Sequence, residues 1–261
     1  MSLIAELIED MGQDKEIVKS FHPKDSLPDT IFDKKEDSYE LKSEIREKLL
    51  EISNEFLEFI GIDFFVFDII LTGSLANFNW SKYSDVDLHI LIDLNEFDSG
   101  KVNSIAYHQI VKEFFDSKKN IWNSNTDITI KGYDVELYVQ DVDEKHLSTG
   151  VYSILNNEWV VEPKKLESAF DLDEKKILDK SEDYAKQIDL LVGMAEKGED
   201  VAKNVDDLKA KIKKFRQTGL EDGGEYSYEN LTFKLLRRNG YVEKLMSVKT
   251  TVRDKKLSLP Q

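Results

Sequence analysis

The sequence contains no cysteine, only four prolines and no long uninterrupted hydrophobic run among its 261 residues. Without cysteine the chain can form neither disulfide bonds nor thiolate metal sites, which agrees with a reducing compartment. No segment approaches the roughly 20 apolar residues that a membrane-spanning helix needs. Residues 1–9 lack the basic and long apolar regions of a signal peptide. We therefore expect a cytoplasmic protein without a membrane partner.

Positive charge is also scarce, because 52 acidic residues outnumber 36 basic ones and leave a formal net charge of -16. Non-specific DNA or RNA binders gain most of their affinity from cations that neutralise phosphates, so non-specific DNA binding is not expected. A basic cluster near the C-terminus leaves a local surface that could meet RNA or a triphosphate. The cluster consists of Lys234, Arg237, Arg238, Lys244, Lys249, Arg253, Lys255 and Lys256.

Hydrophobic residues, by contrast, make up 40% of the chain and include 14 Phe, 10 Tyr and 3 Trp. This content is sufficient to fill the core of a folded globular protein. A chain of this length forms one large domain or two small ones.

The most informative segment places two carboxylates on one side of a predicted strand. Side chains in a strand point alternately to opposite faces, so one face carries the apolar residues Val86, Leu88, Ile90 and Ile92. Asp85 and Asp87 then lie together on the opposite side. Like charges at this spacing repel each other unless they are solvated or neutralised. Hard oxygen ligands of this kind suit Mg²⁺ or Mn²⁺ that holds nucleotide phosphates.

Just upstream, the apolar run 67–71 leads into Gly73 and Ser74, and residues 75–80 can begin a helix. A strand that turns through glycine into a helix N-terminus offers free backbone N–H groups to an anion. Ser74 adds a hydroxyl group with little bulk. We predict that Gly73 and Ser74 bind a triphosphate, and that Ser84, which lies just before the acidic pair, orients Asp85 within the same site.

This pattern resembles the nucleotidyltransferase superfamily, which includes DNA polymerase beta, the CCA-adding enzymes, the poly(A) polymerases and small antibiotic or protein nucleotidyltransferases. Its members carry Gly followed by Gly or Ser, a spacer, and then two carboxylates separated by one apolar residue. Here, ten residues separate Ser74 from Asp85. The family also needs a third carboxylate on a later strand, and Glu136, flanked by Val135 and Leu137, matches it. Beyond residues 67–140 the chain is loosely similar to uncharacterised bacteriophage nucleotidyltransferases.

The resemblance implies an α+β fold, with a mixed sheet, flanking helices and a C-terminal helical lobe. It also implies transfer of a nucleoside monophosphate from a nucleoside triphosphate, expected to be ATP, to a hydroxyl group with release of pyrophosphate. Asp85, Asp87 and Glu136 would hold Mg²⁺ or Mn²⁺. The acceptor would be a small molecule, a protein or an RNA end. Lys234 and Arg238 of the helical lobe are predicted to contact the nucleotide or an anionic acceptor.

Three parts are expected along the chain: a peripheral N-terminal segment (1–40), a catalytic domain (41–145) and a helical domain (146–261). Apolar spacing predicts helices within 39–60 and around 105–115, and Lys131-Gly132 predicts a hairpin turn. Two further helices are expected within 165–217, and a third after Ser227, which can cap it. Tyr152 is expected to pack between the lobes.

Two other functions are compatible with the same residues. A catalytically idle relative would bind nucleotide as a sensor or partner protein. A helical interaction protein would carry the acidic strand only as an ordinary polar face. Intact Asp85, Asp87 and Glu136 favour the enzyme over the idle relative, because a degraded site usually loses a carboxylate.

Overall fold

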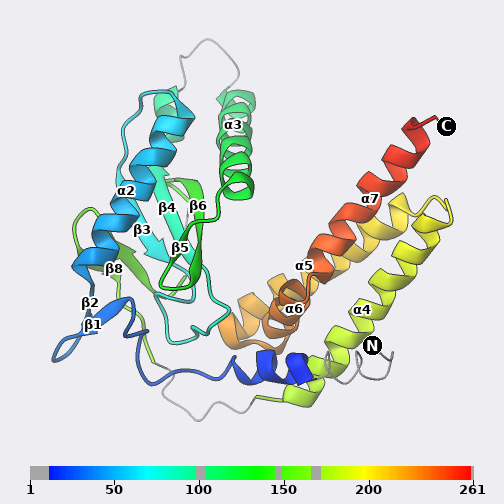
Figure 1. The fold of residues 1–261 in the computed structure, drawn as a ribbon, viewed down its shortest axis with the longest axis horizontal. Helices are drawn as coiled ribbons and strands as arrows, with labels where there is room; N and C mark the ends of the chain where they lie inside the picture. The colour runs from blue at the N-terminus through cyan, green and yellow to red at the C-terminus, as the bar shows by residue number, and fades with distance from the viewer. Residues whose placement is uncertain (1–11, 98–103, 145–147, 166–171, 260–261) are drawn as a thin grey trace. The chain divides into compact units, whose positions relative to one another are not determined.

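The computed structural model describes residues 12–97, 104–144, 148–165 and 172–259 (Figure 1). It divides the chain into two compact units. The sheet unit contains residues 23–169, and the helical unit combines residues 1–22 with 170–261. The mixed α+β class predicted from the sequence is confirmed. None of the helices in the described ranges is both long enough and apolar enough to cross a membrane.

A six-stranded mixed sheet forms the centre of the sheet unit, in the order β5-β6-β4-β3-β7-β8. Strands β4 and β6 pair in parallel, and every other neighbouring pair in this sheet is antiparallel. The strands are β3 (Asp68–Thr72), β4 (Val86–Ile92), β5 (Thr129–Ile130), β6 (Tyr133–Asp141), β7 (Val151–Ser153) and β8 (Glu158–Val161).

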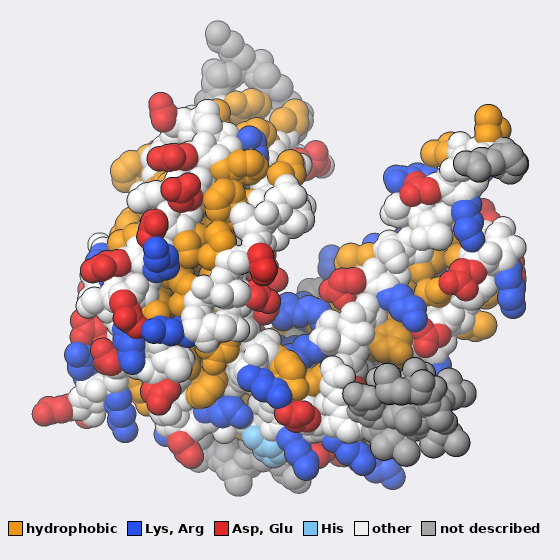
Figure 2. Space-filling view, viewed as in Figure 1, with side chains coloured by type: hydrophobic (Ala, Val, Ile, Leu, Met, Phe, Trp, Pro, Cys, Tyr) orange, Lys and Arg blue, Asp and Glu red, His pale blue; other side chains and the backbone are white. Residues whose placement is uncertain are grey.

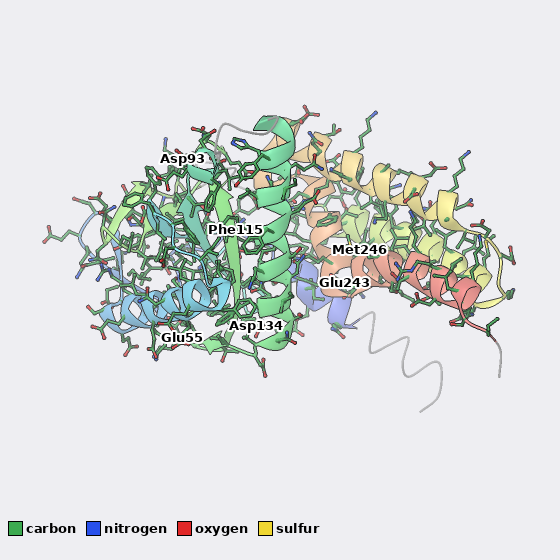
Figure 3. All side chains as sticks on the ribbon, turned by 90° about the horizontal axis from the view of Figure 1, so that it is seen from above. Glu55, Asp93, Phe115, Asp134, Glu243 and Met246 are labelled. Atoms are coloured by element: carbon green, nitrogen blue, oxygen red, sulfur yellow. The ribbon has the colours of Figure 1, made fainter. Side chains whose placement is uncertain are left out.

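Strand β4 shows the predicted alternation, because every second residue from Val86 to Ile92 is buried. Helices α2 (Ser43–Ile60) and α3 (Ser104–Asn125) pack against this apolar face. Phe56 of α2 and Phe115 of α3 belong to the same core cluster as Leu88. Figure 3 shows Phe115 directed from α3 toward the strands. A short 3₁₀ helix, η1 (Leu94–Phe97), follows β4.

Strands β1 (Phe32–Lys34) and β2 (Tyr39–Leu41) form a separate two-stranded sheet. The prediction that residues 1–40 form a peripheral segment is therefore wrong for this part of the chain. Leu27, Ile31 and Phe32 are at most 2% exposed and belong to the core of the sheet unit. Residues 12–19 are helical and belong to the helical unit instead. The first 11 residues of the predicted N-terminal segment lie outside the described residues.

The boundary between the units lies near residue 169 rather than at 146, because β7 pairs with β3 and β8 pairs with β7. Tyr152 of β7 is 1% exposed, and its ring contacts those of Phe32 and Trp159. All three residues belong to the sheet unit, so Tyr152 is a core residue of that unit.

The hairpin between β5 and β6 turns at Lys131 and Gly132, as predicted, with φ values of 52° and 85°. Strand β5 covers only the start of β6, because it pairs with Tyr133 and Asp134. Farther along β6, the Asn123 side chain of α3 takes the place of a neighbouring strand. Its Nδ2–H donates to the Leu137 carbonyl (3.0 Å), and its Oδ1 accepts from the Leu137 N–H (3.1 Å).

We predict that Asn123→Ala lowers the free energy of unfolding by about 1–2 kcal/mol, because both backbone groups of Leu137 lose their partner. Asn120→Ala is the matched control, since Asn120 is exposed on the same helix and the change brings the same gain in helix propensity. Urea denaturation of both variants measures the difference. Equal stability of the two variants would show that the Asn123 side chain does not support the sheet edge.

The helical unit is built from α4 (Glu174–Glu196), α5 (Ala202–Gly223), α6 (Tyr228–Arg238) and α7 (Tyr241–Leu257), together with the 3₁₀ helix η2 (Gly224–Tyr226). The first three helices were predicted, and α7 was not. Ser227 caps α6 as expected, because its hydroxyl oxygen accepts from the Asn230 N–H. Tyr184, Val205 and Leu236 lie in the core of this unit and are at most 1% exposed.

Burial and the nearby Glu225 carboxylate raise the pKa of Tyr226 to about 12. An unfolded tyrosine titrates near pH 10. The folded state therefore keeps its proton while the unfolded state loses it, so this contribution is complete below about pH 10 and is lost as the pH rises toward 12. Tyr226→Phe should remove a late phenolate transition from the ultraviolet titration. A titration curve that keeps this transition would contradict the assignment.

Candidate functional site

Three adjacent strands place Thr72, Asp87 and Glu136 in one row across the sheet. Asp87 of β4 pairs with Thr72 of β3 on one side and with Glu136 of β6 on the other. Residues that are in register on neighbouring strands point to the same face of the sheet, and neighbouring strands lie roughly 4.7–4.9 Å apart. The two carboxylates that the sequence assigned to one site are therefore neighbours, and both are half-buried.

The row lies toward the end of the sheet where β4 and β6 begin. Asp134, labelled in Figure 3, marks this end, and Asp93 marks the opposite end, where β4 has finished. Asp85 directly precedes β4 and is also half-buried. The face with the row is opposite the face where α2 and α3 pack. Acidic side chains also gather on the exposed side of α2 in Figure 2, away from this row.

Gly73, the first residue after β3, lies directly against the Asp87 carboxylate. A Cβ atom at Gly73 would be 1.7 Å from Asp87 Oδ2 and 2.6 Å from Cγ. Gly73 also has a φ of 73°, in the left-handed region that residues with a side chain rarely adopt. Both the space and the backbone conformation at this position therefore require glycine.

Three serines connect the Gly73-Ser74 turn to the loop before Asp85. The Ser74 hydroxyl donates to Ser84 Oγ (2.7 Å), which also accepts from the Ser81 N–H (2.9 Å). Ser84 is 6% exposed, whereas Ser74 is half-exposed. Ser84 thus holds Ser74 at the open side of the turn, and as the residue before Asp85 it also fixes the start of β4.

The segment after Ser74 forms consecutive turns, so the predicted helix at residues 75–80 is wrong. Asn77 explains the difference, because its side chain forms hydrogen bonds within the loop cluster instead of pointing to solvent. Its Nδ2–H donates to the Gly73 carbonyl (2.7 Å) and to Ser148 Oγ (3.0 Å), and its Oδ1 accepts from the Thr149 hydroxyl (2.8 Å). Side-chain bonds of this kind compete with helix formation.

Gly150 completes this loop cluster. A Cβ atom there would lie 2.1 Å from the Ala76 carbonyl oxygen and 2.8 Å from Asn77 Oδ1. The Thr72 hydroxyl donates to the Gly150 carbonyl (3.2 Å). The backbone around Gly150 is therefore pressed against the turn that follows β3, and it fixes the position of Gly73.

In the parts of the chain that the structure describes, no group of three or more His, Asp or Glu side chains is arranged to hold a metal ion. The donor set still suits Mg²⁺ or Mn²⁺ in its chemistry, because Asp85, Asp87 and Glu136 all offer hard carboxylate oxygens. Glu136 Oε2 accepts a hydrogen bond from the Tyr138 hydroxyl. That bond occupies one of the two oxygens of Glu136.

Lys234 and Arg238 lie on α6 of the helical unit and have partners there. Lys234 Nζ is 2.9 Å from Glu225 Oε2. Arg238 Nη1–H donates to Ser20 Oγ (3.0 Å), and its guanidinium group lies 4.8 Å from the centre of the Phe21 ring. These contacts give both residues a role in joining parts of the helical unit, beside the nucleotide contact that the sequence predicts for them.

Sequence reasoning missed Asn77, Gly150 and Tyr138. Period-two alternation along β6 could have placed Tyr138 on the face of Glu136. The bonds of Asn77 and Gly150 join segments more than 70 positions apart, and nothing local in the sequence indicates them.

The sheet unit is thus an α+β unit with a row of carboxylates beside a glycine turn. Comparison of the chain with protein-family models, with curated proteins and with solved structures gave no match. The function proposed below therefore rests on the chemistry and placement of these residues.

We predict that Gly73→Ala displaces the Asp87 carboxylate and destabilises the fold. Gly132→Ala is the matched control, because Gly132 has a φ of 85° but nothing within 4 Å of an added Cβ. The left-handed strain of roughly 1–2 kcal/mol is common to both variants, so the excess loss in Gly73→Ala measures the contact with Asp87. The double variant Gly73→Ala/Asp87→Ala lacks the carboxylate. In urea denaturation, its loss of stability relative to Asp87→Ala alone should no longer show that excess. Equal losses in the two glycine variants would contradict the close approach.

Proposed function

We propose that the chain is a nucleotidyltransferase that depends on Mg²⁺ or Mn²⁺ and transfers a nucleoside monophosphate from a nucleoside triphosphate to a hydroxyl group, with release of pyrophosphate. The observation that carries the proposal is the register of Asp87 with Glu136, next to a glycine turn that only glycine can form. Packing of the sheet does not require two neighbouring half-buried carboxylates. A site for a cation that binds phosphate needs carboxylate ligands side by side.

Asp85, Asp87 and Glu136 are the residues that would hold the cation. When bound, Mg²⁺ supplies neutralisation of the triphosphate charge and lowers the pKa of an acceptor hydroxyl. The backbone N–H groups of the turn would bind phosphate oxygens. The Ser74 hydroxyl donates its one proton to Ser84 Oγ in this structure, so it would bind a phosphate oxygen by turning that proton away from Ser84. Catalysis by such a site consists of positioning and electrostatic stabilisation.

The acceptor is proposed to be a small molecule, a protein hydroxyl or an RNA end. The net charge of -16 disfavours a long nucleic acid that would be held through its backbone phosphates. A short acceptor makes few such contacts, so the charge of the chain opposes it less.

A second candidate function is binding of a nucleotide without turnover. One observation favours it: no group of three potential ligands in the described ranges is arranged to hold a metal ion. The two functions differ in a simple experiment. The chain is incubated with labelled ATP, CTP, GTP or UTP and Mg²⁺. Pyrophosphate is released, and the label moves to an acceptor, only if the chain is an enzyme.

We predict that Asp87→Asn leaves the fold intact and reduces metal-dependent transfer by on the order of a hundredfold or more, because a ligand to the cation is lost. Asp63→Asn is the control, since Asp63 is an exposed acid of the same unit. Pyrophosphate release measures turnover, and circular dichroism checks the fold. Turnover in Asp87→Asn as fast as in Asp63→Asn would rule out the proposed cation site.

A further inference from the structure

The residues next to the carboxylate row form a second row on the same face of the sheet. His89 of β4 pairs with Tyr138 of β6. This pair lies two residues farther along both strands than the pair formed by Asp87 and Glu136. The Tyr138 hydroxyl group donates to Glu136 Oε2 within the same strand. The second row is therefore bonded directly to the first.

Contacts with two other side chains fix the Tyr138 ring. The His89 ring centre lies 4.8 Å from the Tyr138 ring centre, with an interplanar angle of 34°. The Lys119 Nζ atom of α3 lies 4.9 Å from the centre of the Tyr138 ring. A cation near an aromatic ring is attracted to the electrons of its face. Two neighbouring elements, β4 and α3, thus set the position of this ring.

His89 is itself held by Gln140. Gln140 Nε2–H donates to the Glu144 carbonyl (3.3 Å), so its Oε1 is the atom that meets His89 Nδ1 (2.7 Å). Because that oxygen can only accept, His89 Nδ1 carries the proton. A chain of contacts therefore runs from the backbone at Glu144 through Gln140, His89 and Tyr138 to Glu136.

We propose that Tyr138 is a positioning residue that holds Glu136 ready to bind the divalent cation. The inference rests on the proposed function, in which Glu136 is a metal ligand. A free glutamate side chain loses rotamer entropy when it is fixed, and a partner that fixes it beforehand removes part of that cost from metal binding. The phenol is a suitable partner because it is a neutral donor. It holds one carboxylate oxygen, leaves the other for the cation and does not cancel the negative charge.

A purely structural role for Tyr138 would use the ring and not the hydroxyl group. Tyr138→Phe separates the two roles, because phenylalanine keeps the ring contacts with His89 and Lys119. Tyr133→Phe is the matched control: Tyr133 lies on the same strand, and its hydroxyl bonds to Thr30 rather than to Glu136.

The experiment measures binding of Mn²⁺ alone to the full chain by electron paramagnetic resonance. Loss of a group that orients a metal ligand typically weakens binding by about 10–100-fold, and we expect a loss in this range for Tyr138→Phe. Glu136→Gln should weaken binding at least as much, and Tyr138→Phe should add nothing in the Glu136→Gln background. Tyr133→Phe should bind Mn²⁺ like the parent chain.

Parent-like Mn²⁺ affinity in Tyr138→Phe, or an additive loss in the double variant, would overturn the positioning role while leaving the proposed function intact. Failure of the parent chain to bind Mn²⁺, or unchanged binding in Asp87→Asn, would overturn both proposals. Urea denaturation of each variant confirms that the protein measured is folded.

Discussion

The close approach of the Gly73 backbone to the Asp87 carboxylate is the constraint on which the site depends. It is possible only because Gly73 has no Cβ and adopts a positive φ. The turn after β3 can therefore fold back over β4 at the level of the paired carboxylates. A bulkier residue at position 73 would displace either the turn or the Asp87 carboxylate. Asp87 would then no longer lie in line with Thr72 and Glu136.

The two faces of the sheet have different tasks. On one face, Leu88 and its neighbours are fully buried beneath α2 and α3, which fixes the backbone of β4. On the other face, Asp87 and His89 present polar groups that are only half-buried. Because side chains alternate strictly, each apolar residue that anchors the strand also determines where the adjacent carboxylate points. The precision of the polar row comes from the close packing of the opposite face.

Local patterns explain what the sequence predicted correctly. Alternation identified β4, helical spacing identified α2 and α3, and Lys131-Gly132 identified the hairpin, because each signal lies within a few residues. Features that depend on distant partners were not predictable. The short strand β7 belongs to the sheet only because β3 offers it an edge. Helix formation after Ser74 failed because Asn77 bonds to a segment 71 residues away. The same distance hides the contribution of Gly150.

The return of β7 to β3 has a consequence for the order of folding. Strands β3 and β4 are close in the sequence, whereas the bond from Thr72 to Gly150 closes a loop of 78 residues. Long loops lose more chain entropy on closure, so contacts across them tend to form late and open early. We expect the β7–β8 edge to be the first part of the sheet to separate under mild denaturation. Hydrogen exchange at the loop after β3 would then report that opening before the core of β4 exchanges.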